Sequence, residues 1–289
     1  MADRFIAIDW GTSNRREYLI EDGRVLGVSR DERGVIEMGG TGYEEAVASI
    51  RARHGDLPVL IAGMAGSNRG WREAPYADAP ASAGDIARQL LWVQPGRTAI
   101  VPGVAWRDRE APSVMRGEEV QLFGAVAAGL VPPDALVAQP GTHNKWVEMQ
   151  GGAIGRFSTL MTGELFALLA KHSILSAQLT AAVTPGLAFL EGVRHTQERP
   201  LPSALFEARA AMLLGFRPQE DTSDYVSGLL IGTDVASADV RGREAFILSD
   251  ETLGALYQAA VAELGGTAYL VDTVAAFTAG MALIRSLSQ

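Results

Sequence analysis

Two segments about 130 residues apart share one pattern of residues that could bind a phosphate group. In each, an apolar run leads into Gly-Thr, one further residue, Asn and a cation, and a second strand follows. The segments are Gly11-Thr12-Ser13-Asn14-Arg15 and Gly141-Thr142-His143-Asn144-Lys145. Such a hairpin tip presents backbone N–H groups and a hydroxyl in one direction, which suits a phosphate. Either copy alone is compatible with an ordinary β-hairpin, but the matched pair predicts a polyphosphate held from two sides.

The residue that ends each apolar run distinguishes the two copies. Asp9 provides a carboxylate in the first copy, whereas the second has the neutral Gln139. Only the first copy therefore has a carboxylate that could bind a cation. Together the two tips and the single carboxylate indicate nucleotide phosphoryl chemistry.

Composition narrows the possible classes of protein. The chain has 289 residues, 47% hydrophobic and 20% charged, which is typical of a soluble globular protein with one large or two medium domains. A formal net charge of −9 without a basic stripe argues against nucleic-acid binding. The absence of cysteine excludes disulfides and thiol nucleophiles and fits a cytoplasmic protein. No signal peptide is expected, and no apolar run approaches the roughly 20 residues of a membrane span.

Hydrophobic periodicity and turn residues predict a mixed α/β chain with two three-stranded meanders, the second at 136–158. The other expected strands are 4–9, 15–20, 24–30, 58–62 and 98–101, and the expected helices are 43–53, 83–92, 118–130, 163–175, 176–183, 203–214, 222–236, 250–264 and 273–286. Ser249 or Asp250 is the expected N-cap of the helix at 250–264. The charged segment 103–113 is the expected domain boundary.

A meander followed by alternating helices and strands, present twice, resembles the actin-like (ribonuclease H-like) ATPase superfold. The resemblance implies two ribonuclease H-like domains, 1–112 and 113–289, that face each other across a cleft with ATP at its floor. Asp9-x-Gly11-Thr12 is similar to the first phosphate motif of that superfold, and Gly141-Thr142 to the second. The sequence has no P-loop motif, no dinucleotide fingerprint after a strand and no G-x-S-x-G elbow.

Two acids follow a glycine at the start of the helix expected at 118–130. Sugar kinases of this superfold carry Gly-Asp at the corresponding place, and its carboxylate accepts the proton of the attacking hydroxyl. The resemblance therefore implies that Glu118 is the general base, with Glu119 as the alternative. Both acids could also simply complement the helix dipole. Arg116 beside them is a bidentate donor that could bind an acid substrate, or a surface cation.

Seven segments extend the resemblance over nearly the whole chain. They are IDWGTSNRR (8–16), AGMAGSNRGW (62–71), APY (74–76), MRGEE (115–119), PGTHNKWV (140–147), MTGEL (161–165) and SGLLIG (227–232). In this order they resemble the 2-dehydro-3-deoxygalactonokinase family. The resemblance implies ATP-dependent phosphorylation of the 6-hydroxyl of 2-dehydro-3-deoxy-D-galactonate, a step of galactonate catabolism.

Phosphoryl transfer requires positioning and charge neutralisation, which suggests roles for the residues of these motifs. Asp9 is expected to hold Mg²⁺ through water, because this ion gives up its hydration shell reluctantly. The expected phosphate-binding residues are Gly11, Thr12, Ser13, Asn14, Arg15, Gly141, Thr142, His143 and Lys145. The expected substrate-binding residues are Ser67, Asn68, Arg69, Arg116, Thr162 and Glu164, and the substrate carboxylate is assigned to Arg116, Arg69 or Arg72.

Two departures from the wider sugar-kinase pattern leave questions open. Glu118 stands where an Asp is usual, and the segment 246–253 lacks the Gly-Gly run of the adenosine motif. A kinase for a different sugar or sugar acid is one alternative, and a nucleotide-switched binding protein without sugar kinase activity is another. The oligomeric state is left open, with a homodimer as one candidate.

Overall fold

The computed structural model describes residues 3–289, which form two compact units. Unit 1 contains the chain up to Asp134 together with Glu148–Ser158 and Asp272–Gln289, and unit 2 contains Ala135–Val147 and Thr159–Val271. The chain therefore passes between the units more than once. The division expected at residue 112 lies inside unit 1 and stays a prediction about domains.

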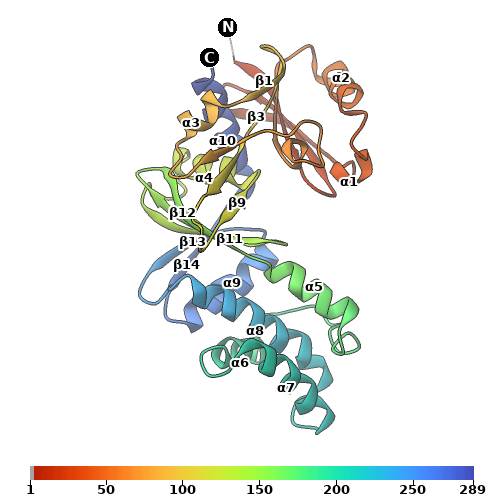
Figure 1. The fold of residues 1–289 in the computed structure, drawn as a ribbon, viewed down its shortest axis with the longest axis vertical. Coiled ribbons are helices and arrows are strands. Elements are labelled where there is room, and N and C mark those ends of the chain that lie inside the picture. Colours follow the sequence, from red (N-terminus) through yellow and green to blue (C-terminus); the bar gives the residue numbers. More distant parts are fainter. Residues whose placement is uncertain (1–2) are drawn as a thin grey trace. The chain divides into compact units, whose positions relative to one another are not determined.

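A six-stranded sheet with the order β3-β2-β1-β4-β7-β6 forms the centre of unit 1 (Figure 1). Its strands are β1 (Arg4–Trp10), β2 (Arg15–Glu21), β3 (Arg24–Asp31), β4 (Val59–Gly63), β6 (Leu91–Gln94) and β7 (Thr98–Ile100). The first three strands are an antiparallel meander, as expected, and β1, β4 and β7 are parallel. A smaller sheet has the order β5-β8-β9 and comprises β5 (Tyr76–Asp78), β8 (Gly103–Trp106) and β9 (Ser113–Met115).

Helices cover both faces of the large sheet. They are α1 (Val35–Met38), α2 (Tyr43–His54), the 3-10 helix η1 (Met64–Gly66), α3 (Ala83–Arg88), α4 (Glu118–Ala127) and α10 (Thr273–Leu287). Alternate β1 residues Ile6, Ile8 and Trp10 share a core with α2. Tyr18 of β2 lies opposite Ala7 and contacts Phe277 of α10, which places the other face against that helix.

Glycines let α4 and α10 approach closely. A Cβ atom on Gly124 would lie 1.8 Å from the Ala276 carbonyl oxygen, and one on Gly280 would lie 1.9 Å from that of Val120. Any larger side chain at either position would therefore force the two helices apart. The start of α4 is thus held rigidly on the same face of the sheet as the side chain of Asp9.

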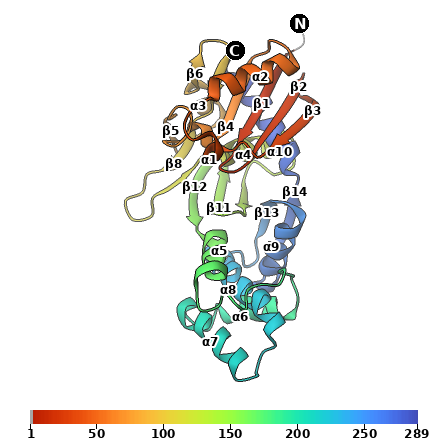
Figure 2. The same ribbon diagram turned by 90° about the vertical axis from the view of Figure 1, so that its right-hand side faces the viewer.

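Unit 2 is largely helical (Figure 2). Its helices are α5 (Thr162–His172), α6 (Leu187–His195), α7 (Leu201–Leu213), η2 (Gln219–Asp221), α8 (Thr222–Ser237) and α9 (Glu251–Glu263). A five-stranded sheet has the order β12-β11-β10-β13-β14, comprising β10 (Ala135–Gln139), β11 (Asn144–Gln150), β12 (Ala153–Leu160), β13 (Glu244–Leu248) and β14 (Thr267–Val271). The end of β11 and most of β12 are counted with unit 1. β10, β13 and β14 are parallel neighbours, and α9 and α8 share a core with them.

Several expected elements differ from the structure. The helix expected at 83–92 ends at Arg88, because Gly96 forms a tight turn and draws Leu91–Gln94 into a strand antiparallel to β7. The helix expected at 176–183 is a series of turns, and α6 follows it instead. The segment 103–113, expected to be charged and irregular, contains β8, which pairs with β9. Asp250 is the N-cap of α9, and its side chain accepts from the Leu253 N–H.

Candidate active site

The first Gly-Thr tip, Gly11–Asn14, lies between β1 and β2 and is fixed by backbone hydrogen bonds. The Gly11 N–H donates to the Asn14 carbonyl at 2.9 Å. The carbonyls of Gly11, Thr12 and Ser13 accept from the backbone N–H groups of Val35, Ile36 and Gly34, at 3.0, 3.1 and 3.3 Å. A Cβ atom on Gly34 would lie 2.4 Å from the Thr12 carbonyl oxygen, so this close approach requires glycine. The exposed side chains of Thr12 and Ser13 are thereby carried on a defined backbone.

Asp9 lies one residue before the end of β1, opposite Arg16. Its side chain is 25% exposed, and Oδ2 lies 3.5 Å from Nη1 of Arg16. Burial raises the pKa of the Asp9 carboxyl, Arg16 lowers it, and the negative charge of Glu118 raises it again. Glu118 therefore lies close enough for its carboxylate and that of Asp9 to repel each other.

The two acids at the start of α4 lie in different surroundings. The Glu118 side chain is partly exposed and accepts from the Arg116 backbone N–H at 2.9 Å. Glu119 is fully buried and accepts from the Gly117 N–H at 2.7 Å, and burial raises its pKa to about 8. Glu118 is consequently the acid that solvent can reach, whereas Glu119 faces the protein interior.

Gly117 fixes how α4 begins. Its φ of +102° lies in a region that other residues rarely adopt. A Cβ atom there would also lie 3.1 Å from Cα of Gly63, the last residue of β4. Because β4 is hydrogen-bonded to β1, Gly117 brings the start of α4 to the end of the strand pair that carries Asp9.

Arg116 lies against the segment that follows β4. Its guanidinium stacks 4.3 Å from the ring centre of Tyr76, and Nη2 donates to the Ala74 carbonyl at 2.8 Å. Nε and Nη1 are buried and have no hydrogen-bond partner within residues 3–289. An arginine with two unused buried donors is costly unless a ligand accepts from them.

The expected substrate residues after β4 are divided by the structure. Ser67 is 8% exposed, and its hydroxyl donates to the Met64 carbonyl at 2.8 Å, so it stabilises the local turn. Asn68, Arg69 and Arg72 are exposed. The turn itself requires glycine, because a Cβ atom on Gly70 would lie 2.3 Å from the Ala65 carbonyl oxygen.

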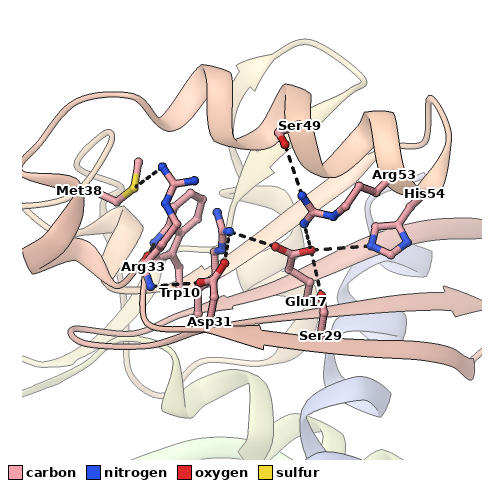
Figure 3. A network of polar contacts seen from close by, with 10 residues as sticks. Trp10, Glu17, Ser29, Asp31, Arg33, Met38, Ser49, Arg53 and His54 are labelled. Atoms are coloured by element: carbon pink, nitrogen blue, oxygen red, sulfur yellow. Dashed lines mark hydrogen bonds and ion pairs between the residues drawn. The ribbon is translucent and has the colours of Figure 1, made fainter.

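Arg15, expected at the phosphates, instead pairs with Glu17 and Asp31, which belong to the polar network shown in Figure 3. Side chains alternate along a strand, so Arg15 shares the α2 face of the sheet with Trp10, while Arg16 shares the other face with Asp9. Arg15 is 3% exposed, lies over the Trp10 ring, and forms ion pairs with Asp31 and with Glu17 at 3.2 Å. Its charge is thus compensated inside unit 1.

The second Gly-Thr tip, Gly141–His143, lies between β10 and β11, and a side chain closes its turn. The Gly141 N–H donates to Oδ1 of Asn144 at 2.6 Å. The Glu164 N–H donates to the Thr142 carbonyl at 3.0 Å, and a Cβ atom on Gly163 would lie 2.3 Å from the Gly141 carbonyl oxygen. The start of α5 therefore packs directly on this tip.

The charged residues of the second tip also have defined contacts. The His143 imidazole lies 2.5 Å from the Glu164 carboxylate, and both side chains are partly exposed. Lys145 is 4% exposed, and its Nζ donates to the His143 carbonyl at 3.1 Å. Thr142 and His143 are exposed, whereas Thr162 is buried.

A cavity of about 420 Å³ adjoins the second tip within unit 2. Its polar lining comes from the tip, α5, α8 and α9, and the remainder is mostly apolar. The lining residues are Gly141, Thr142, Asn144, Thr162, Gly163, Phe166, Val183, Ser227, Leu230, Ile231, Leu253, Leu256 and Tyr257. A cavity with apolar walls that ends at a phosphate-type tip has the size and chemistry of a nucleoside site.

The sequence reasoning missed Asp234 of α8, which lies behind one wall of this cavity. Its carboxylate is 1% exposed and accepts from Asn144 Nδ2, Trp146 Nε1, Thr162 Oγ1 and Tyr257 Oη. Burial raises the pKa of Asp234, and these four hydrogen bonds lower it. The available signal was a lone acid on an otherwise apolar stretch of helix, which requires buried partners.

Residues 3–289 contain neither a clustered metal site nor a membrane-spanning helix. No group of three or more His, Asp or Glu residues is arranged to hold a metal ion. No helix in this range is long and apolar enough to cross a membrane. A metal at Asp9 would therefore depend on water and on a bound phosphate for most of its ligands, which is the usual situation for Mg²⁺.

The chain matches known proteins along nearly its whole length. The family model described as 2-keto-3-deoxy-galactonokinase matches residues 9–284. The 2-dehydro-3-deoxygalactonokinase of Escherichia coli K12 is 40% identical over 295 residues, covering 100% of this chain and 98% of the relative. A crystal structure of a Sinorhizobium meliloti protein described as a 2-dehydro-3-deoxygalactonokinase has a TM-score of 0.90 and 38% identity, covering 98% of each chain.

More distant structures show the fold alone. The activator of the 2-hydroxyisocaproyl-CoA dehydratase from Clostridium difficile, with bound ADPNP, has a TM-score of 0.52 at 11% identity and covers 98% of this chain and 95% of its own. Component A of the Acidaminococcus fermentans (R)-2-hydroxyglutaryl-CoA dehydratase has a TM-score of 0.53 at 12% identity, covering 99% of both chains. The fold is that of the actin-like ATPases and sugar kinases, as expected.

Proposed function

The chain belongs to the 2-keto-3-deoxy-galactonokinase family, and we propose that it transfers the γ-phosphoryl group of ATP to the 6-hydroxyl of 2-dehydro-3-deoxy-D-galactonate. Family membership makes it an ATP-using carbohydrate kinase of galactonate catabolism. The observation within the chain that best supports the proposal is the neighbouring pair Asp9 and Glu118. Asp9 lies where the sequence motif places a magnesium residue, and Glu118 is an accessible acid at the start of α4.

Glu118 is the proposed general base. Its carboxylate accepts the proton of the sugar-acid hydroxyl as the new oxygen–phosphorus bond forms and the bond to the bridging oxygen of ADP breaks. The hydrogen bond from the Arg116 N–H orients the carboxylate, and the glycine before it fixes the backbone. Glu119 is a poor base by comparison, because it is fully buried and hydrogen-bonded to the Gly117 N–H.

Asp9 is the proposed magnesium residue, and the residues present fit that ion. A single carboxylate is enough for Mg²⁺, which keeps several waters and takes further ligands from phosphates. The raised pKa of Asp9 reflects burial and the nearby charge of Glu118, and a bound cation would offset both effects. When bound, Mg²⁺ neutralises charge on the β- and γ-phosphates.

The two Gly-Thr tips are the proposed phosphate-binding elements. Gly11–Asn14 and Gly141–His143 carry exposed hydroxyl or imidazole groups on backbones that neighbouring helices hold in place. We assign Arg15 to holding the first tip rather than to the phosphates, because its charge is paired with Asp31 and Glu17. The proposed role of Lys145 is to support the second tip through the His143 carbonyl.

Arg116 is the proposed partner of the substrate carboxylate. It carries two buried unused donors, whereas Arg69 and Arg72 are exposed. Asn68 and Arg69 are the proposed contacts of the substrate hydroxyls, and Ser67 supports the turn that carries them. In unit 2, Thr162 acts on the second tip through the buried Asp234, and Glu164 acts on it through His143.

The cavity beside the second tip is the proposed adenosine site. Phe166, Leu230 and Leu253 supply apolar surface for a purine, and Ser227 and Tyr257 supply hydroxyls. In the proposed site, apolar contacts from α8 and α9 take the place of the Gly-Gly run that the chain lacks. The cytoplasmic location and the homodimer stay predictions from the sequence.

An ADP-release assay with three acceptors tests the proposed function. We expect rapid ATP- and magnesium-dependent turnover with 2-dehydro-3-deoxygalactonate and slow turnover with galactose or a neutral sugar derived from galactose. A site that pairs a charged group leaves donors buried and unpaired when that group is absent, which costs roughly 1–3 kcal/mol for each donor. Equal kcat/KM for galactose would contradict a sugar-acid kinase, and ADP release that no acceptor stimulates would indicate a nucleotide-switched binding protein.

A further inference from the structure

Asp234 joins the second phosphate tip to the wall of the neighbouring cavity. Its Oδ1 accepts from Trp146 Nε1 at 2.6 Å. Its Oδ2 accepts from Asn144 and Thr162, and from Tyr257 Oη at 2.8 Å. Asn144, Thr162 and Tyr257 all line the cavity, whereas Asp234 itself does not. A single carboxylate thus fixes three polar residues that come from β11, α5 and α9.

The contact with Asn144 leads directly to the tip. Asn144 donates to Asp234 through Nδ2 and accepts from the Gly141 N–H through Oδ1. Rotating the amide by half a turn would break both hydrogen bonds, because it would set the NH₂ group against the Gly141 N–H. Asp234 therefore determines which way the Asn144 amide faces, and with it the closed form of the turn that carries Thr142.

Burial makes this arrangement costly unless it is complete. Asp234 and Asn144 are 1% and 2% exposed, and a buried carboxylate requires that its lone pairs be used. An acid is the only residue of this size that can accept at both oxygens. Asparagine would turn an NH₂ group toward the Trp146 N–H or toward the Asn144 NH₂, and neither of these donors can become an acceptor.

We propose that Asp234 is a positioning residue of the nucleotide site, which holds the Gly141–Thr142 tip in its phosphate-binding form through Asn144. This inference rests on the proposed function only in taking the tip and the cavity as the place where ATP binds. Asp234 is buried and does not line the cavity, so its proposed effect on the nucleotide is indirect. It acts by keeping the Gly141 N–H engaged with Asn144, so that the backbone of the tip does not have to reorganise when a phosphate arrives.

Asp234→Asn and Asn144→Ala test the two steps of this connection, with Trp146→Phe as the matched control. The control also removes a hydrogen bond to Asp234, but one that does not lead to the tip. We expect the dissociation constant for ATP, measured by calorimetry, to rise about tenfold or more in the first two variants. The KM for the sugar acid at saturating ATP should stay within about twofold, and the control should bind ATP like the wild type.

The same measurements separate positioning from a merely structural role. Loss of folded protein would lower the active fraction without moving the dissociation constant of the remainder. The combined variant Asp234→Asn with Asn144→Ala should bind ATP no more weakly than the weaker single variant, because both interrupt one connection. Unchanged ATP binding in Asn144→Ala would overturn the inference even if Asp234→Asn failed to fold. A wild type that binds ATP but phosphorylates no sugar acid would contradict the proposed function and leave this test intact.

Discussion

Glu119→Gln should change how the stability of the protein depends on pH. Glu119 is fully buried, and its pKa is raised from 4.5 to about 8, mainly by desolvation and then by the charge of Glu118. Between these two values the folded state holds a proton that the unfolded state has released. The free energy of unfolding therefore falls as pH rises through this window. The stabilising contribution is complete below pH 4.5 and is lost as pH passes about 8.

The magnitude follows from the width of that window. A fully coupled proton changes the free energy of unfolding by about 1.4 kcal/mol per pH unit, so the whole window corresponds to at most about 5 kcal/mol. Glutamine keeps the oxygen that accepts from the Gly117 N–H and cannot ionise. The variant should therefore lack this part of the slope and become progressively more stable than the wild type as pH rises.

Urea unfolding at several pH values from 4 to 9 measures the difference directly. Subtracting the wild type from Glu119→Gln removes the contribution of every other titrating group that the substitution leaves unchanged. Glu198→Gln is the matched control, because Glu198 is exposed. The control should show a constant difference across the series. A constant difference for Glu119→Gln as well would refute the reasoning, since it would mean that Glu119 ionises as it does in the unfolded chain.

Three further predictions concern the first Gly-Thr tip, the proposed magnesium residue and the proposed partner of the substrate carboxylate. Gly34→Ala would place a Cβ atom 2.4 Å from the Thr12 carbonyl oxygen, so it should displace the first tip and raise the KM for ATP about tenfold. Gly27→Ala is the control and should leave the KM unchanged, because a Cβ atom there has nothing within 4 Å. Equal KM values for the two variants would contradict the role of Gly34 in holding the first tip. Asp9→Asn should lower kcat more than tenfold at saturating magnesium, because a lost metal anchor is worth more than about 1.4 kcal/mol, and retention of a tenth of the activity would remove Asp9 from that role. Arg116→Lys should lower kcat/KM for the sugar acid about 10²-fold and leave the KM for ATP unchanged, because lysine lacks the bidentate donors of arginine. A larger loss in Arg72→Lys would assign the substrate carboxylate to Arg72 instead.

The sequence predicted the elements that depend on local patterns. The first three strands were placed within about a residue at each end, because alternation and Gly-containing turns determine a meander locally. Asp250 was a candidate N-cap for the same reason. The strands β13 and β14 were not predicted, since each is a parallel strand of five residues without regular apolar–polar alternation, and such a short run resembles a helix segment.

Site residues that depend on pairing across the fold were harder to predict. Arg15 and Arg16 are adjacent in sequence, and only the register with β1 shows that Arg16 shares a face with Asp9. Asp234 is separated from Asn144 by 90 residues, so no local pattern connects them. Burial likewise distinguishes Glu118 from Glu119, and it depends on how α4 packs rather than on the Gly-Glu-Glu motif itself.

The turnover of Glu118→Gln beside that of Glu119→Gln, with ATP and 2-dehydro-3-deoxygalactonate both saturating, tests the central claim most directly. A general base at Glu118 predicts a loss of roughly 10²- to 10⁴-fold in kcat for Glu118→Gln, with ATP binding nearly unchanged. Glu119→Gln should retain kcat within a few fold, because glutamine resembles the protonated, fully buried acid. Reversed effects would move the base to Glu119, and two mild effects would contradict a general base at the start of α4.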